Sequence, residues 1–184
     1  MQAGCVPVKR SSFFIPSFSR SLILLLGLTV IAAGISMADD VWVVRENGVG
    51  PVEIGMKLSQ LNTTLSESFA VPPNREDQAC FSVSPAKHPS VTFLIEQNLL
   101  ARIDVDEPGI STAEGVQVGD SEAHALKAYG RRLEITPRHD TEGHYLTLRS
   151  VDGRYGIKFE TEKGKIEAFY AGRAEAIQYV DGCE

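Results

Sequence analysis

The sequence has little of the chemistry on which catalytic and cofactor sites depend. Its 184 residues include three cysteines, four histidines and one tryptophan. It contains no Cys-x-x-Cys pair, no Gly-x-Ser-x-Gly turn that would present a nucleophilic serine, and no glycine spacing of a nucleotide-binding loop. We therefore find no catalytic set, and we expect a protein that is not an enzyme and that uses no cofactor.

Basic residues are also scarce. The chain has 18 lysines and arginines against 24 acidic residues, and three of the basic ones, Lys9, Arg10 and Arg20, precede residue 39. From Asp39 onward, 15 basic and 24 acidic residues give a net charge of −9. A protein of that charge repels nucleic acid and anionic membranes, so we expect neither as a partner.

The uncharged apolar run of the chain is too short for a membrane-spanning helix. It extends over the fourteen residues 22–35, whereas a span needs about 20. Positive residues precede the run, and Ser36-Met37-Ala38 follows it in the small-x-small form that signal peptidase recognises. We predict a signal peptide over residues 1–38 and a periplasmic or secreted protein with no stable membrane anchor after cleavage. A retained anchor is the alternative.

Cleavage would leave two cysteines, because Cys5 belongs to the predicted signal peptide. Two thiols in an exported, oxidising setting most often pair, so we predict a disulfide between Cys80 and Cys183. A reactive thiol pair is the alternative, but the two residues lie far apart in the sequence. The predicted bond would tie the end of the chain to its first half.

One pattern occurs twice in the sequence. Gly55 precedes a helical segment with leucines at positions 58, 61 and 65, and Gly119 precedes a helical segment over residues 121–129. A loop and β-type alternation follow each segment. The alternating residues of the first copy recur 66 positions later: Val91, Phe93, Leu100 and Ile103 correspond to Ile157, Phe159, Ile166 and Phe169. Agreement over a helix and a hairpin predicts a tandem repeat.

We therefore predict an α+β fold of two tandem repeats, each a short helix packed on an antiparallel β-meander. Repeat 1 covers residues 39–108 and repeat 2 covers residues 109–184. Asp120 or Ser121 can cap the second helix at its start, and Gly130 can end it. Trp42 is expected in an edge strand or over one end of the core. Further strands are expected over residues 80–83, 90–95, 100–105, 145–148, 156–161 and 165–170.

One loop carries the side chains that metal ions favour. His139, Asp140, Glu142 and His144 lie within six residues, and they could hold a divalent ion if the loop curled around it. The spacing is not that of a helical His-x-x-x-His site, and a solvated loop that leads into a strand explains the same residues. We predict no metal site. A metal-dependent or hydrolytic protein that uses this loop is the alternative function.

The repeat resembles a known structural unit. A short strand that ends in glycine, a helix that closes on Tyr-Gly and a β-meander make up the unit of the β-lactamase-inhibitor-protein-like fold. The same unit occurs singly in the small lipoprotein of the outer-membrane assembly machinery. The resemblance covers Gly48 to about Gly172 and rests on Ile54-Gly55-Met56 and Val118-Gly119-Asp120. It implies an exported protein that binds another exported or envelope protein, as an inhibitor or an assembly adaptor, and it carries over no inhibitory residue.

A meander that is covered by a helix on one face leaves its other face for a partner. Alternation puts Lys158, Glu160 and Tyr170 on that face of the second repeat, and Leu94 and Arg102 on that face of the first. Alternatively, Leu94 packs against the other repeat. We predict that these five residues bind another protein, with most of the binding energy from the tyrosine and the arginine.

Overall fold

Two β-sheets and two short α-helices make up the fold. The computed structural model describes residues 42–139, 141–180 and 182–183, and the predicted signal peptide lies outside them. The helices are α1 (Leu58–Leu65), α2 (Glu122–Tyr129) and the 3-10 helices η1 (Gly130–Arg132) and η2 (Ala176–Gln178). The strands are β1 (Val43–Arg45), β2 (Gly48–Val49), β3 (Val52–Glu53), β4 (Cys80–Val83), β5 (Val91–Glu96), β6 (Leu99–Val105), β7 (Ser111–Thr112), β8 (Leu133–Pro137), β9 (His144–Arg149), β10 (Tyr155–Glu162) and β11 (Lys165–Arg173). The predicted α+β class is confirmed.

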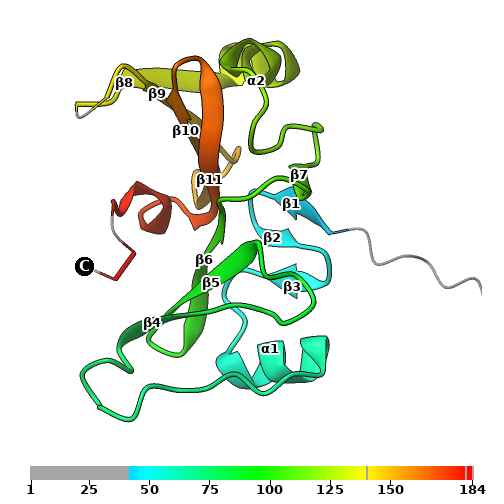
Figure 1. Cartoon of the computed structure of the whole chain (residues 1–184). Helices are drawn as coiled ribbons and strands as arrows, with labels where there is room; N and C mark the ends of the chain where they lie inside the picture. The colour runs from blue at the N-terminus through cyan, green and yellow to red at the C-terminus, as the bar shows by residue number, and fades with distance from the viewer. Residues whose placement is uncertain (1–41, 140, 181, 184) are drawn as a thin grey trace, which may run out of the picture. The chain divides into compact units, whose positions relative to one another are not determined.

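Seven strands form the larger sheet, in the order β4-β5-β6-β11-β10-β9-β8 (Figure 1). All of its neighbouring strands are antiparallel. Strands that follow one another in the chain are neighbours, except at the junction of β6 with β11, where Val105 pairs with Phe169 and Arg102 pairs with Gly172. This junction joins the meander β4-β5-β6 to the meander β8-β9-β10-β11, so both belong to one sheet.

The junction depends on a glycine. A Cβ atom on Gly172 would lie 2.4 Å from the carbonyl oxygen of Ala101 and 2.8 Å from the Cα atom of Arg102, both on the facing strand β6. Contacts that short do not occur between a real Cβ atom and backbone, so a larger residue would force the two strands apart. Gly172 therefore lets β6 and β11 approach closely.

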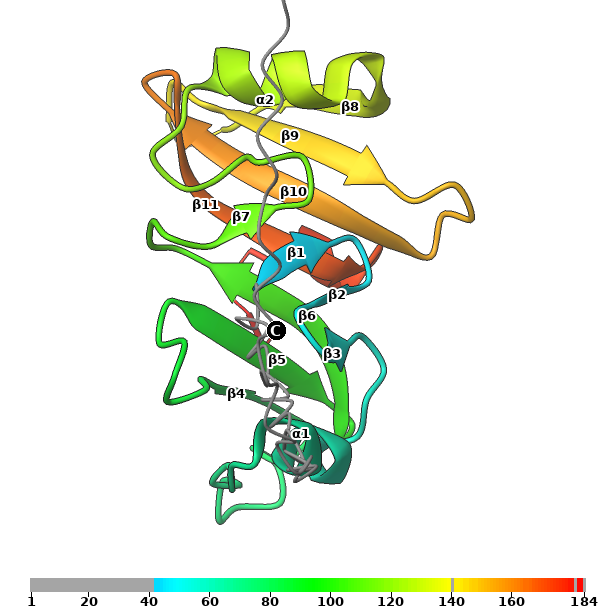
Figure 2. The same ribbon diagram turned by 90° about the vertical axis from the view of Figure 1, so that its right-hand side faces the viewer.

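Four short strands form the smaller sheet, in the order β3-β2-β1-β7 (Figure 2). Together with α1 and α2, this sheet covers one face of the larger sheet, which we call the inner face (Figures 1 and 2). Trp42 precedes β1 and is buried there, with its ring stacked 3.7 Å from the ring of His88. The prediction that this tryptophan covers the core is confirmed. The alternative prediction, that it lies in an edge strand, is wrong, because β1 lies between β2 and β7.

The second α-helix begins and ends at the predicted signals. The side chain of Ser121 accepts a hydrogen bond from the backbone N–H of His124 at 3.1 Å, and Gly130 adopts the positive φ of 59° that ends the helix. Both α-helices bury an apolar stripe in the inner core, with Leu58 and Leu61 on α1 and Ala125 and Tyr129 on α2. Within the described residues, neither helix has the length and apolar character needed to cross a membrane.

The two halves of the chain share local contacts around their glycines. Gly55 and Gly119 both adopt a φ of 90°. The N–H of Gly55 donates to the carbonyl of Leu100 at 2.8 Å, and the N–H of Gly119 donates to the carbonyl of Ile166 at 2.9 Å. In each case the glycine begins a turn that leads from the strand region into a helix. These contacts agree with the predicted duplication, which stays a prediction, as do the boundaries of the two repeats.

The described residues that follow β11 cross the outer face of the larger sheet, opposite the smaller sheet. After β11, the helix η2 lies on this face, and its residues Ala176 and Ile177 are fully buried (Figure 1). The segment ends at Cys183, whose disulfide to Cys80 on β4 joins Cα atoms 5.5 Å apart. The predicted pairing of Cys80 with Cys183 is confirmed. We call the described residues 174–180 and 182–183 the C-terminal segment.

The disulfide is expected to contribute strongly to stability, because it closes a sequence separation of 103 residues. A Cys80→Ser, Cys183→Ser variant should lose about 2 to 5 kcal/mol of the free energy of unfolding. Urea unfolding, followed by tryptophan fluorescence, measures this loss. Wild type kept in a reducing agent is the matched control and should unfold at the same urea concentration as the variant. Equal stability of the oxidised wild type and the variant would contradict the prediction.

Candidate binding surface

The five residues predicted to bind a partner all lie on the outer face of the larger sheet. Leu94 pairs with Arg102, and Lys158 pairs with Tyr170, in registers that put both members of each pair on the same side. Glu160 lies two residues after Lys158 on β10 and therefore shares its face. The strands that carry the five residues are β5, β6, β10 and β11, which are consecutive neighbours across the junction. The structure thus brings them onto one continuous surface.

The sequence led us to expect that this face is open over its whole width. In the structure, part of the face is covered. Leu94 is 0% exposed and Arg102 is 2% exposed, so neither can bind a partner in this structure. The C-terminal segment runs across this side of the sheet from β11 to β4. A Cβ atom on Gly156 of β10 would lie 2.8 Å from Cδ1 of Ile177, so the missing side chain gives η2 room to pack. The expectation of an uncovered face is corrected for Leu94 and Arg102.

Arg102 braces the C-terminal segment. Its guanidinium donates two hydrogen bonds to the carboxylate of Asp104, at 2.6 and 2.9 Å. Its Nη1 donates to the backbone carbonyls of Ala176 at 3.1 Å and Tyr179 at 3.0 Å. Burial raises the pKa of Asp104, although the hydrogen bonds from the arginine act in the opposite direction. These contacts use the donors of the guanidinium within the chain and make the arginine a structural residue.

A row of polar and aromatic residues remains beside the C-terminal segment. We call Tyr145, Lys158, Glu160, Tyr170 and Asp104 the polar strip. Their positions are adjacent because Glu160 pairs with Tyr145, Lys158 pairs with Tyr170 and Tyr170 pairs with Asp104 in the sheet. All of them except the lysine are partly exposed. The strip therefore offers two aromatic rings and charges of both signs to a partner.

Cations hold the aromatic rings of the strip in place. The ammonium of Lys158 lies 4.0 Å from the centre of the Tyr145 ring, and the guanidinium carbon of Arg102 lies 4.6 Å from the centre of the Tyr170 ring. Both distances are within the range of cation–π attraction. The two cations therefore restrain the positions of the rings.

Arg138 closes one end of the strip. Its guanidinium lies 5.6 Å from the centre of the Tyr145 ring. Its Nη1 atom is 3.6 Å from a carboxylate oxygen of Glu160 and 3.5 Å from one of Glu167. The guanidinium thus lies near two carboxylates at this end, and the arginine side chain is only 11% exposed. The arrangement restrains both Glu160 and the adjacent aromatic ring.

Besides Asp104, burial shifts the pKa values of two further groups in the strip. It lowers the pKa of Lys158, although the nearby carboxylate of Glu160 acts in the opposite direction. Burial also raises the pKa of Tyr170, and the carboxylates of Glu160 and Asp104 raise it further because a phenolate beside them would be repelled. Both shifts disfavour the charged form of the side chain.

Sequence reasoning did not name three residues of this surface, Tyr145, Asp104 and Arg138. The first two could have been found by counting across the strands, because Tyr145 faces Glu160 and Asp104 faces Tyr170. Arg138 follows β8 and precedes a turn in which its N–H donates to the carbonyl of Gly143 at 3.0 Å. Its position depends on the geometry of that turn, which the loop predicted from the sequence did not specify.

The histidine-containing loop does not gather into a metal site among the residues that can be described. His139 and Glu142 are exposed, and Asp140 lies outside the described residues. The ring of His144 instead lies 3.1 Å from a carboxylate oxygen of Glu122 on α2. In the described part of the chain, no three residues among His, Cys, Asp and Glu form a group that could hold a metal ion.

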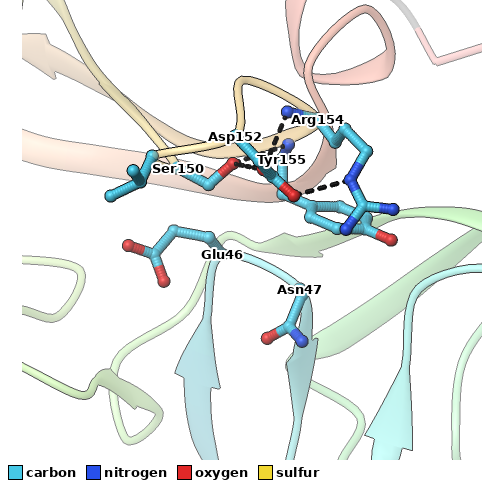
Figure 3. Close-up of a pocket in the computed structure, with 7 residues that line it drawn as sticks. Glu46, Asn47, Ser150, Asp152, Arg154 and Tyr155 are labelled. Carbon is cyan, nitrogen blue, oxygen red and sulfur yellow. Dashed lines mark hydrogen bonds and ion pairs between the residues drawn. The ribbon is translucent and has the colours of Figure 1, made fainter.

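A hollow of about 440 Å³ lies elsewhere, between the turn after β1 and the turn before β10 (Figure 3). Asp152 dominates its polar chemistry, and it accepts hydrogen bonds from the hydroxyl of Ser150 at 2.6 Å and from Nε of Arg154 at 2.6 Å. These bonds, the first above all, lower the pKa of Asp152 to about 2. This carboxylate already accepts hydrogen bonds from donors within its own turn. We therefore interpret it as a residue that stabilises the turn, and we do not propose a binding site in the hollow.

Comparisons with known proteins assign no family to the chain. No protein-family model matches it, and no curated protein matches it. A solved structure, that of the protein YfeY from Escherichia coli, is similar with a TM-score of 0.45 and 13% sequence identity, over 71% of this chain and 99% of that chain. Similarity at that level supports no conclusion about fold or function.

The raised pKa of Tyr170 predicts a stability change at alkaline pH. An unfolded tyrosine loses its proton near pH 10.0, whereas the folded Tyr170 keeps it to higher pH. The neutral phenol therefore contributes stability that is fully present below pH 10 and is lost as the pH rises above it. A Tyr170→Phe variant should lose less stability between pH 9 and pH 12 than wild type does. Urea unfolding at several pH values tests this, and equal losses in both proteins would refute it.

Proposed function

We propose that this chain is an exported, non-enzymatic binding protein that contacts another exported or envelope protein through the polar strip. The partner lies against the exposed parts of β9, β10, β11 and β6, beside the C-terminal segment. Inhibition of an exported enzyme and support of envelope assembly are the two roles that the resemblance of the repeat unit implies.

The observation that carries this proposal is the pair of partly exposed tyrosines with cations against their rings. The Lys158 ammonium lies 4.0 Å from the Tyr145 ring centre, and the Arg102 guanidinium lies 4.6 Å from that of Tyr170. Tyrosine and arginine are enriched among residues that dominate binding energy at protein interfaces. The main hydrophobic core lies on the opposite, inner face, and neither ring is part of it.

Rigidity of the strip favours binding. A partner that binds flexible side chains must order them, at a cost of about 0.5 to 1.5 kcal/mol for each side chain. Here the tyrosines are restrained by cations and by β-strands in the interior of the sheet, between the edge strands β4 and β8. Much of that ordering has therefore occurred before the partner arrives, as in other tyrosine-rich binding surfaces.

The disulfide supports export. Cys80 and Cys183 are bonded, and structural disulfides persist mainly in oxidising compartments outside the cytosol. This agrees with the signal peptide predicted over residues 1–38, which lies outside the described residues. We place the mature protein, from Asp39 onward, in the periplasm or outside the cell.

Capture of a partner by the mature chain tests the proposal. The full chain is expressed with its own first 38 residues, and the exported product should have an intact mass that begins at Asp39. It is then used as bait for exported proteins of the source cell. A Tyr145→Ala, Tyr170→Ala variant should capture the partner at least about tenfold less well than wild type.

The matched control is Tyr155→Ala, because this tyrosine is also partly exposed but lines the hollow of Figure 3. The control should capture the partner as wild type does. Circular dichroism confirms that each variant is folded. If the folded double variant captures the partner as well as wild type, the polar strip is not the binding surface.

A further inference from the structure

Lys158 differs from the other charged residues of the polar strip in its burial. It is 4% exposed, yet it lies on the outer face, with Tyr145 and Tyr170 on the two neighbouring strands. Its ammonium lies 4.0 Å from the centre of the Tyr145 ring. A positive charge is therefore held in the floor of the strip, between two tyrosines.

The other cations around the strip already have carboxylate partners. Arg102 binds Asp104 through two hydrogen bonds, and Arg138 lies within 3.6 Å of both Glu160 and Glu167. The ammonium of Lys158 has no such partner, since no carboxylate oxygen lies within 4.0 Å of it among the described residues. One positive charge of the surface is thus left without an ion pair.

An ammonium without an ion pair, at the end of a side chain that is largely buried, is unfavourable for folding. Removal from water disfavours its charge, and the lowered pKa of Lys158 agrees with that cost. Cation–π attraction to one ring recovers part of the cost, but a methionine of similar length would fill the same space without a charge. A role of this charge in binding would explain why a residue that lowers stability is present on the outer face.

We propose that a carboxylate from an acidic side chain of the protein partner pairs with Lys158 between Tyr145 and Tyr170. This inference rests on the proposed function and names the chemistry of the partner at the centre of the strip. A single carboxylate matches a single ammonium, whereas a phosphate group would bring more negative charge close to Glu160 and Asp104. The two tyrosines then shield the new ion pair from water, which strengthens it.

Peptide selection tests the proposal and does not require the partner to be identified. Phage that display random twelve-residue peptides are selected on the immobilised mature chain, and the peptides are ranked by their loss of binding to the Tyr145→Ala, Tyr170→Ala variant. The peptides that depend on the tyrosines should share one Asp or Glu. Replacement of that residue by Asn or Gln should weaken binding to wild type about 10- to 100-fold, measured by calorimetry.

A Lys158→Met variant completes a double-mutant cycle. It should bind the acidic peptide about as weakly as wild type binds the neutral peptide, and the acidic-to-neutral change should then cost less than about threefold. The variant should also be no less stable in urea than wild type, because it removes a charge that has no ion pair from a largely buried side chain. If Lys158 served only to stabilise the fold, the Lys158→Met variant would be less stable in urea than wild type.

Two outcomes overturn the proposal in different ways. If the selected peptides need the tyrosines but share no acidic residue, or bind Lys158→Met with unchanged affinity, the strip binds proteins and the carboxylate inference is wrong. If no peptide depends on the tyrosines, the proposed function fails as well. The comparison of acidic and neutral peptides on wild type keeps the test valid even if the Lys158→Met variant does not fold.

Discussion

The antiparallel pairing of β6 with β11 is the constraint on which the other features of this molecule depend. It joins two meanders that are distant in the sequence into one seven-stranded sheet. Gly172 makes the close approach of the two strands possible, since any Cβ atom there would collide with the backbone of β6. The same pairing puts Asp104 on one side of Tyr170, which has Lys158 on its other side, so the polar strip extends from one meander into the other.

The outer face of the joined sheet has two parts with different roles. The C-terminal segment covers one part, where Arg102 binds two of its carbonyls and the disulfide fixes its end on β4. Buried donors that are satisfied within the chain make this part structural. The other part keeps the tyrosines partly exposed and holds one largely buried lysine, Lys158, whose ammonium has no ion pair among the described residues. We infer that the C-terminal segment limits the binding surface to the polar strip.

The sequence predicted the long, periodic elements well and the short ones poorly. The predicted strand over residues 80–83 matches β4, and the start and end signals of α2 are those of the structure. Strands of two residues, such as β2 and β3, and the 3-10 helix η2 are too short to show a periodic pattern. Without η2, the sequence could assign Leu94 and Arg102 to the correct face but could not reveal that the chain itself covers them. Residues 133–137 alternate as a strand should, and β8 could have been predicted there.

The central claim, that a partner contacts the polar strip, is tested most directly by hydroxyl-radical footprinting of tyrosines in the complex of the mature chain with a selected acidic peptide. Tyr145, Tyr155 and Tyr170 are all partly exposed in the unbound chain, so all three should be oxidised there. We predict that the peptide protects Tyr145 and Tyr170 and leaves Tyr155, at the hollow between the turns, unprotected. Protection of Tyr155 with unchanged oxidation of the other two would contradict the account.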